Sequence, residues 1–139
     1  KVQAAGINVI GNYIFGLPDD TIETMNETLD LALEAQCEFA NFYSAMAYPG
    51  SKLYTMAVEK GLRLPEAWSG YSQHSYDCTP LPTETLKGGE VLNFRDKAFQ
   101  DYFTDGSYRR MIERKFGPAV LEHIKRMVAI PLPRKLLEE

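Results

Sequence analysis

The chain has 139 residues, of which 45% are hydrophobic and 24% are charged, a balance close to that of ordinary globular domains. This composition argues against disorder, and the length suits one domain rather than two. The net charge of −4 excludes a protein dominated by attraction to a phosphate backbone, and no apolar run approaches the roughly 20 residues of a membrane span. We therefore expect no nucleic-acid partner and no membrane span.

The two cysteines, Cys37 and Cys78, are too few for a disulfide scaffold. They are also too few for a cysteine-rich metal site, because a structural zinc takes about four ligands. This usage fits a reducing compartment, so we expect a cytoplasmic protein. The chain begins at Lys1 without an initiator methionine, and its first residues resemble the end of a helix. These features predict a fragment of a longer protein.

Charge is unevenly distributed along the chain. Residues 1–106 carry 7 Lys and Arg against 15 Asp and Glu, a net charge of −8, whereas residues 107–139 carry 8 against 4, a net charge of +4. The basic segment either meets an acidic partner, docks on the acidic part of its own chain, or forms a solvated helical face.

Strand and helix patterns alternate at the start of the chain. Residues 7–15 are β-branched and aromatic and mostly apolar on both faces, which is typical of a strand buried on both sides in a parallel sheet. Asp20, with Glu23 three residues later, resembles a capping box, and helical spacing predicts a helix over 20–36. Residues 39–46 form a second strand pattern. Strand, helix and strand in this order predict a βαβ unit with parallel strands.

The rest of the chain is mainly helical. Ser51 is positioned to cap a helix over 53–60 that Gly61 ends. Residues 62–82 have an irregular pattern, rich in proline and aromatic residues. Further helices are expected to begin at Thr83, at Ser107 and after Gly117. The predicted fold class is therefore α/β, with helices only in the second half.

A glycine and a tight turn end the first predicted strand. The segment from Gly11 to Gly16 is neither a phosphate-binding loop nor a dinucleotide fingerprint, because the required lysine and glycine spacings are absent. Gly16 nevertheless lies at the carboxyl end of a strand, where α/β folds hold ligands, and it would let a ligand approach the backbone. Ile14 can offer an apolar face to a flat ring. A plain strand-to-helix turn explains the pattern equally well.

Three stretches resemble the radical S-adenosylmethionine (SAM) enzymes. Residues 16–25, followed by a long helix, resemble the fifth strand and helix of that family, and residues 48–54 resemble the segment after its sixth strand. Residues 94–103 resemble the C-terminal extension of the subgroup that often carries an N-terminal cobalamin-binding domain. The oxidative cyclases of magnesium-protoporphyrin monomethyl ester belong to this subgroup. The resemblance covers nearly the whole chain.

The resemblance implies a fragment of a partial (β/α) TIM-type barrel. Residues 1–61 would be its last βαβ part and residues 62–139 a mainly helical C-terminal extension. In the family, strands five and six line the adenosine pocket. The cofactor-binding candidates carried over from this resemblance are Ile14, Gly16, Phe42, Tyr43 and Ser44, with no catalytic residue and no metal ligand. Asn12 and Asp19 depart from the family's strand motif, in which Gly and Glu occupy these positions.

The chain lacks the cluster motif Cys-x-x-x-Cys-x-x-Cys and the cobalamin motif Asp-x-His-x-x-Gly. The resemblance therefore implies that a parent enzyme binds SAM and a 4Fe-4S cluster whose ligands lie in its N-terminal half, the expected partner of this chain. Cobalamin binding by the parent is left open.

The chain would supply adenosine-binding strands and part of the wall around an unknown small-molecule substrate. The reaction would be reductive SAM cleavage followed by radical chemistry, in a parent of oxidoreductase, cyclase or methyltransferase type. The fragment would be inactive alone. Its unpaired strand edge predicts self-association or a covering helix. The alternative is a small non-catalytic α/β domain that binds a ligand or another protein.

Overall fold

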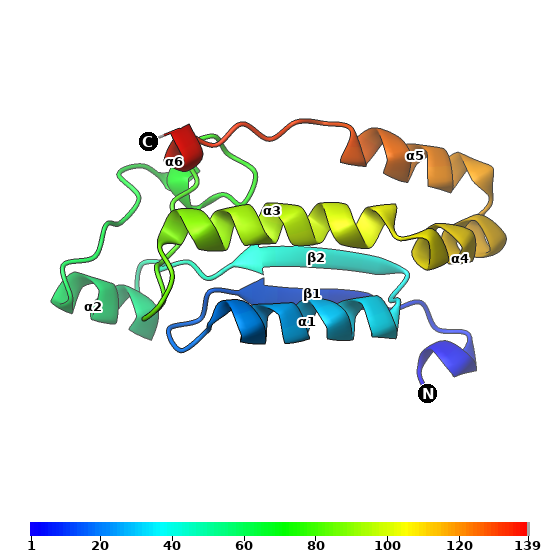
Figure 1. Cartoon of the computed structure of the whole chain (residues 1–139), viewed down its shortest axis with the longest axis horizontal. Coiled ribbons are helices and arrows are strands. Elements are labelled where there is room, and N and C mark those ends of the chain that lie inside the picture. Colours follow the sequence, from blue (N-terminus) through cyan, green and yellow to red (C-terminus); the bar gives the residue numbers. More distant parts are fainter. Residues whose placement is uncertain (139) are drawn as a thin grey trace.

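The computed structural model describes residues 1–138 as an α/β fold built on two parallel strands (Figure 1). The long helix α3 lies beside the sheet, and α4 and α5 follow it at one end. In chain order the elements are η1 Gln3–Ala5, β1 Ile10–Phe15, α1 Ile22–Ala35, β2 Phe39–Ser44, α2 Lys52–Glu59, η2 Trp68–Tyr71, α3 Gly88–Thr104, α4 Gly106–Phe116, α5 Pro118–Val128 and α6 Lys135–Glu138.

The predicted βαβ unit is confirmed. β1 and β2 pair in parallel, in a register that runs from Ile10 opposite Phe39 to Phe15 opposite Ser44, and α1 joins them. A parallel pair needs such a crossover, because a tight hairpin connects only antiparallel strands. The unit brings the carboxyl ends of both strands to the same edge of the sheet.

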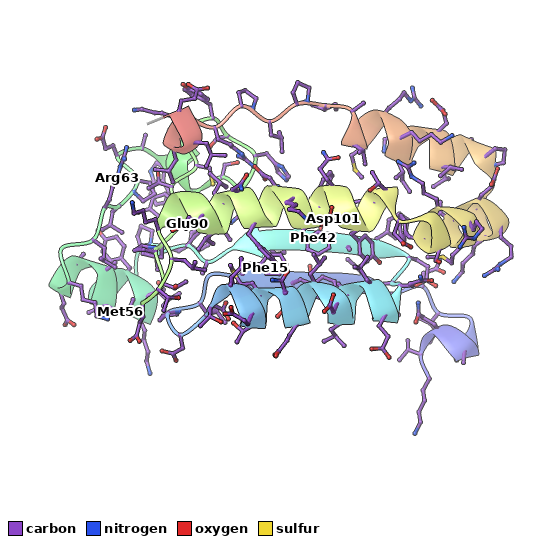
Figure 2. The ribbon with its side chains drawn as sticks, in the orientation of Figure 1. Phe15, Phe42, Met56, Arg63, Glu90 and Asp101 are labelled. Atoms are coloured by element: carbon purple, nitrogen blue, oxygen red, sulfur yellow. The ribbon has the colours of Figure 1, made fainter. Side chains whose placement is uncertain are left out.

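The two faces of the sheet differ in their cover. α1 and α3 pack on one face, where Phe15 and Phe42 are 0% and 1% exposed and lie between the sheet and the helices (Figure 2). On the other face alternate side chains are open to solvent, among them Ile10, Ile14 and Phe39. The prediction that the first strand is buried on both sides is therefore wrong for residues 1–138, because the side chains on the second face of β1 stay largely exposed.

The cap of α1 differs by one residue from the predicted one. Thr21, not Asp20, is the N-cap, and it forms a reciprocal capping box with Thr24. The Asp20 carboxylate is engaged elsewhere, since it accepts the backbone N–H groups of Gly16 and Leu17 at 3.0 and 2.9 Å. Asp20 thus closes the turn that leaves β1.

Later boundaries are partly as expected. Ser51 caps α2 as predicted. Thr83 does not open a helix, because its Oγ1 accepts the backbone N–H groups two and three residues on, and α3 begins only at Gly88. Asp105, rather than Ser107, caps α4. The break at Gly117 before α5 is confirmed.

Part of the basic segment docks on the acidic part of the chain. Lys115 of α4 pairs with Glu38, which is 2% exposed beside the start of β2, and Arg134 pairs with Asp96 of α3. These contacts hold the last helices against the sheet layer. Among residues 1–138, no helix combines the length and the apolar character that crossing a membrane would require.

Candidate ligand site at the carboxyl end of the sheet

A cavity of about 350 Å³ opens at the carboxyl ends of β1 and β2. Three predicted site residues line it, Ile14, Tyr43 and Ser44, together with Leu17 and Gln73 among others. Its volume lies at the lower end of the range for small-molecule sites, about 300–1,000 Å³. The carboxyl edge of parallel strands is also where open α/β sheets hold their ligands.

One wall of this cavity is a pair of cross-strand neighbours. Ile14 and Tyr43 lie opposite each other in the register of the two strands, on the open face of the sheet. Ile14 is 49% exposed, and Tyr43 is half-buried. A branched aliphatic side chain beside a phenol ring makes an apolar surface suited to the face of a flat ring.

Ser44 lines the cavity at the end of β2, but its side chain points to the covered face of the sheet, as does that of its register partner Phe15. The residue is 2% exposed, and its Oγ is the buried side-chain nitrogen or oxygen atom without a hydrogen-bond partner among residues 1–138. Buried hydroxyls are ordinarily paired, since leaving one unpaired costs about 1–3 kcal/mol. This hydroxyl therefore lies on the opposite side of the sheet from Ile14 and Tyr43, and it is not part of the surface that the cavity offers a ligand.

Two other predicted site residues lie outside this cavity. Gly16 has a φ of +80°, and a Cβ there would stand 2.3 Å from Cγ1 of Val91 in α3. Its N–H already donates to Asp20, so local geometry and packing account for the glycine. Phe42 points into the core, where its ring packs against those of Phe15 and Tyr102. Their proposed contacts with adenosine stay predictions.

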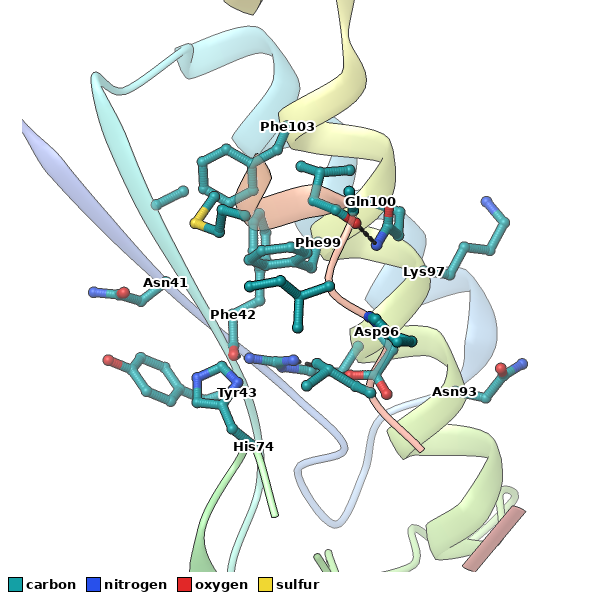
Figure 3. Close-up of a pocket in the computed structure, with 18 residues that line it drawn as sticks. Asn41, Phe42, Tyr43, His74, Asn93, Asp96, Lys97, Phe99, Gln100 and Phe103 are labelled. Carbon is teal, nitrogen blue, oxygen red and sulfur yellow. Dashed lines mark hydrogen bonds and ion pairs between the residues drawn. The ribbon is translucent and has the colours of Figure 1, made fainter. Parts of the chain in front are cut away.

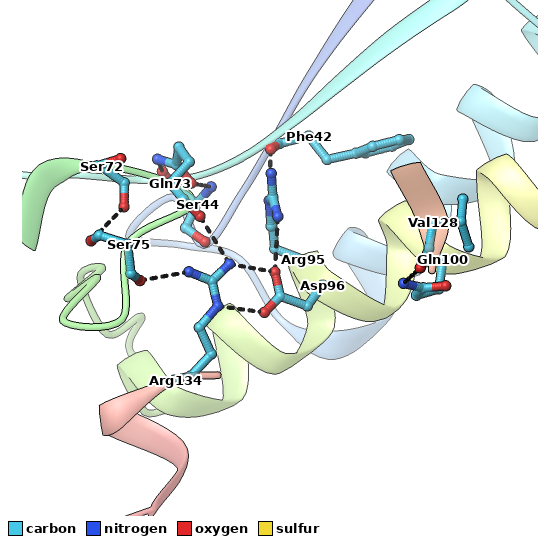
Figure 4. A network of polar contacts seen from close by, with 10 residues as sticks. All are labelled: Phe42, Ser44, Ser72, Gln73, Ser75, Arg95, Asp96, Gln100, Val128 and Arg134. Carbon is cyan, nitrogen blue, oxygen red and sulfur yellow. Dashed lines mark hydrogen bonds and ion pairs between the residues drawn. The ribbon is translucent and has the colours of Figure 1, made fainter. Parts of the chain in front are cut away.

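A polar network that no sequence pattern predicted supports the cavity (Figure 4). The Nε and Nη2 atoms of Arg134 donate to the two carboxylate oxygens of Asp96, each at 2.8 Å. Nη2 also donates to the carbonyl of Gln73 at 2.9 Å, and Gln73 in turn holds the backbone of Ser44. The network thus links the carboxyl end of β2 to α3 and to the last residues of the chain.

One residue of this network, Arg95, stands out in the sequence pattern. Arg95 falls on the apolar stripe of the helix that became α3, and a charge on a buried stripe requires a partner. In the structure it is 2% exposed and donates from Nε to the carbonyl of Phe42 at 2.8 Å and from Nη1 to Asp96. Gln73 and Arg134 carried no comparable signal, because both lie in irregular segments.

Cys37 and Cys78 are both free and buried, and they lie in different surroundings. The Cys37 sulfur is 3.7 Å from the hydroxyl of Tyr13. Burial raises the pKa of Cys78 to about 11, so its thiol stays protonated at neutral pH. Residues 1–138 contain no group of three or more His, Cys, Asp and Glu side chains placed to hold a metal ion.

Two curated proteins match about half of the chain. An uncharacterized methyltransferase of Pyrococcus horikoshii is 33% identical over 67 residues, which are 48% of this chain and 15% of that protein. Bacteriochlorophyllide d C-8(2)-methyltransferase of Chlorobaculum tepidum is 31% identical over 70 residues, 50% of this chain and 16% of that protein. The matched stretch thus spans less than a fifth of either relative. No protein-family profile and no solved structure matches the chain.

Proposed function

We propose that this chain is part of a SAM-dependent methyltransferase and that the cavity at the carboxyl end of the sheet holds the adenosine of SAM. Both matched relatives are named as methyltransferases, and methyltransfer uses an activated methyl donor of this kind. The observation that carries the assignment to this cavity is the cross-strand pair of Ile14 and Tyr43, which forms an apolar wall on the open face at the carboxyl ends of the strands. Such a wall suits the face of a flat ring, at the edge where open α/β sheets hold their ligands.

The residues of the cavity fit adenosine better than they fit a charged group. The apolar surface of Ile14 and Tyr43 suits an adenine ring. Among the described residues, no charged side chain lines the cavity. When bound, SAM supplies the methyl group or radical that the reaction needs. This chain would hold the adenosine, orient it and keep water from it.

The open face of the sheet supports the finer proposal of a partial barrel. Helices cover only one face, and in a (β/α) barrel the helices lie outside while the other face lines the interior. Within residues 1–138, β1 pairs with β2 alone, so its second edge is available to a strand of the N-terminal half. Residues 1–61 would supply the barrel unit and residues 62–139 the extension, joined through one core.

The radical type of chemistry is proposed from the sequence resemblance. Under this proposal the 4Fe-4S cluster is held by the other half of the parent enzyme, and the two buried cysteines of this chain take no part in it. The same resemblance leaves cobalamin use by the parent open and names no substrate, and the cytoplasmic location is proposed from the cysteine usage of the chain. No step of the reaction is assigned to a side chain of this chain.

Equilibrium binding of SAM to the full protein, prepared without oxygen, tests the proposal. Leu53→Trp places an indole in the cavity that Leu53 lines, and we expect it to weaken SAM binding at least ~10-fold by filling that space. Leu31→Trp is the matched control, since Leu31 is 60% exposed on α1. Equal affinities of the two variants would refute the assignment of this cavity. They would favour the alternative of a small interaction domain that uses the open sheet face.

A further inference from the structure

A second, larger cavity of about 710 Å³ lies on the other side of β2 (Figure 3). It is bounded by the outer edge of β2, by one face of α3 and by the segment 127–132, which crosses over it as a roof. Tyr43 is the residue that it shares with the cavity at the carboxyl end of the sheet. The two cavities are therefore separate sites, and ligand binding in the larger one does not depend on the proposed SAM site.

The walls of this cavity are mainly aromatic and aliphatic. The rings of Phe99 and Phe103, one turn apart on α3, have centroids 4.8 Å apart. Met127, Ile130 and Leu132 of the roof segment also line the cavity. Ring faces and flexible aliphatic side chains of this kind pack well against a planar apolar body.

The floor of the cavity carries a buried cation with a spare donor. Arg95 is 2% exposed, and its guanidinium lies 5.7 Å from the ring centroid of Phe99. Its Nε and Nη1 donate to Phe42 and Asp96. Its Nη2 makes no hydrogen bond to any residue in 1–138, although a guanidinium has five N–H donors to place. Nη2 is therefore free to donate to a ligand in the cavity that Arg95 lines.

The charges around the floor do not cancel. Asp96 is shared by Arg95 and Arg134, so one carboxylate faces two guanidinium groups. His74 lies at the rim, and an imidazole is either neutral or positively charged. Partial burial is the main effect that lowers its pKa, and the charges of Arg95 and Arg134 lower it further. Lys97, also at the rim, is paired with Asp101. The floor therefore keeps an excess positive charge, which an anion would neutralise.

The roof of the cavity is fixed at both ends. Gln100 of α3 donates from Nε2 to the carbonyl of Val128 at 3.1 Å, at the end of α5. Arg134, just beyond the roof segment, is held by Asp96, by Gln73 and by the carbonyl of Ser75. A cavity whose walls are already in place binds with a smaller loss of conformational entropy.

We propose that this cavity binds a planar, mainly apolar organic carboxylate, with the carboxylate on Nη2 of Arg95 and the ring system against Phe99 and Phe103. The carboxylate completes the hydrogen bonding of a buried guanidinium and balances its charge, and the ring system fills the apolar remainder. The same cavity disfavours organic cations, because Arg95 and Arg134 repel them.

A pair of probes of the same shape tests this proposal without altering the protein. Calorimetric titration of the full protein compares 2-naphthoate, a planar anion, with 2-naphthamide, its uncharged counterpart. We expect naphthoate to bind at least ~10-fold more tightly, because charge-assisted hydrogen bonds to a buried guanidinium are stronger than neutral ones. Equal affinity for the two probes would overturn the assignment of the anion to Arg95.

Two substitutions locate the binding. Val128→Trp fills the cavity from its roof, and we expect it to abolish naphthoate binding. Val58→Trp is the control, since Val58 is 54% exposed on α2, and binding should be unchanged. Naphthoate binding that survives Val128→Trp, or that excess SAM displaces competitively, would place the probe elsewhere and contradict the proposal. Failure of the SAM site itself leaves the expected results of this titration unchanged.

Discussion

The side-chain amide of Gln73 pairs with both backbone groups of Ser44. The Ser44 N–H donates to Oε1 of Gln73 at 2.8 Å, and Nε2 of Gln73 donates to the Ser44 carbonyl at 3.0 Å. A neighbouring strand would make the same two kinds of bond, so Gln73 ends the sheet at this edge. Together with the bond from Arg95 to the Phe42 carbonyl, it satisfies an edge that is otherwise a template for association. Self-association through the free edge of β1 stays a prediction.

Replacing Gln73 by leucine is expected to destabilise the fold. Gln73→Leu leaves the buried N–H and carbonyl of Ser44 unpaired, and we expect a loss of about 2–4 kcal/mol in the free energy of unfolding in urea. Hydrogen exchange at the Ser44 amide should accelerate. Gln100→Leu is the control, because Gln100 is exposed and makes a single hydrogen bond to Val128, and it should lose less than about 1 kcal/mol. Equal losses in the two variants would contradict this role of Gln73.

Position 16 requires glycine because of its backbone conformation and its closeness to α3. We expect Gly16→Ala to lower the free energy of unfolding by roughly 2–4 kcal/mol, because φ is +80° and the new Cβ would stand 2.3 Å from Cγ1 of Val91. Val91→Ala should relieve the contact but not the backbone strain. A double-mutant cycle in urea should therefore give a loss smaller than the sum of the two single losses. Additive losses would show that the contact with Val91 is unimportant.

The pair formed by Glu38 and Lys115 predicts a loss of stability in acid. Burial raises the pKa of Glu38, but hydrogen bonds from Lys115 and from the N–H of Val9 outweigh this effect and lower the pKa to about 2. Because the folded pKa lies below the usual value near 4.5, the stabilisation is present above about pH 4.5 and is lost as the pH falls toward 2. At pH 6 the free energy of unfolding of the wild-type protein should exceed that of Glu38→Gln by about 2–3 kcal/mol.

Urea denaturation between pH 2 and pH 6 measures this difference. It should shrink steadily below about pH 4.5, as protonation of Glu38 makes the wild-type protein resemble the variant. Glu34→Gln, at an exposed position of α1, should show no comparable pH dependence. A difference between wild type and Glu38→Gln that stays constant down to pH 2 would contradict the lowered pKa.

Local patterns made the strands and helices predictable, because each depends on neighbouring residues. The parallel βαβ unit and the Ser51 cap follow from periodicity and from side chains that bond to backbone a few residues away. The N-cap of α1 was misplaced by one residue, since Asp20 and Thr21 are both good caps and the turn needed Asp20. Such a choice depends on tertiary geometry.

The parts of the site that the sequence did not reveal depend on distant contacts. Gln73 meets Ser44 across 29 positions, and Arg134 meets Gln73 across 61. Neither residue lies in a periodic segment, so no pattern marked them. The open sheet face was also missed, because apolar residues on both sides of a strand indicate burial without saying which chain segment buries them. The resemblance identified the cavity-lining residues Ile14, Tyr43 and Ser44, but it did not separate them from Gly16 and Phe42.

The affinity of the full protein for SAM, measured by equilibrium dialysis with Ile14→Ala, tests the central claim most directly. Ile14 is 49% exposed, so its truncation should change the thermal unfolding temperature little. If its side chain packs on adenine, the affinity should fall roughly 10-fold, whereas Ile10→Ala, on the same face of β1 but outside the cavity, should bind as the wild type does. A folded Ile14→Ala protein with wild-type affinity for SAM would contradict the proposed adenosine site.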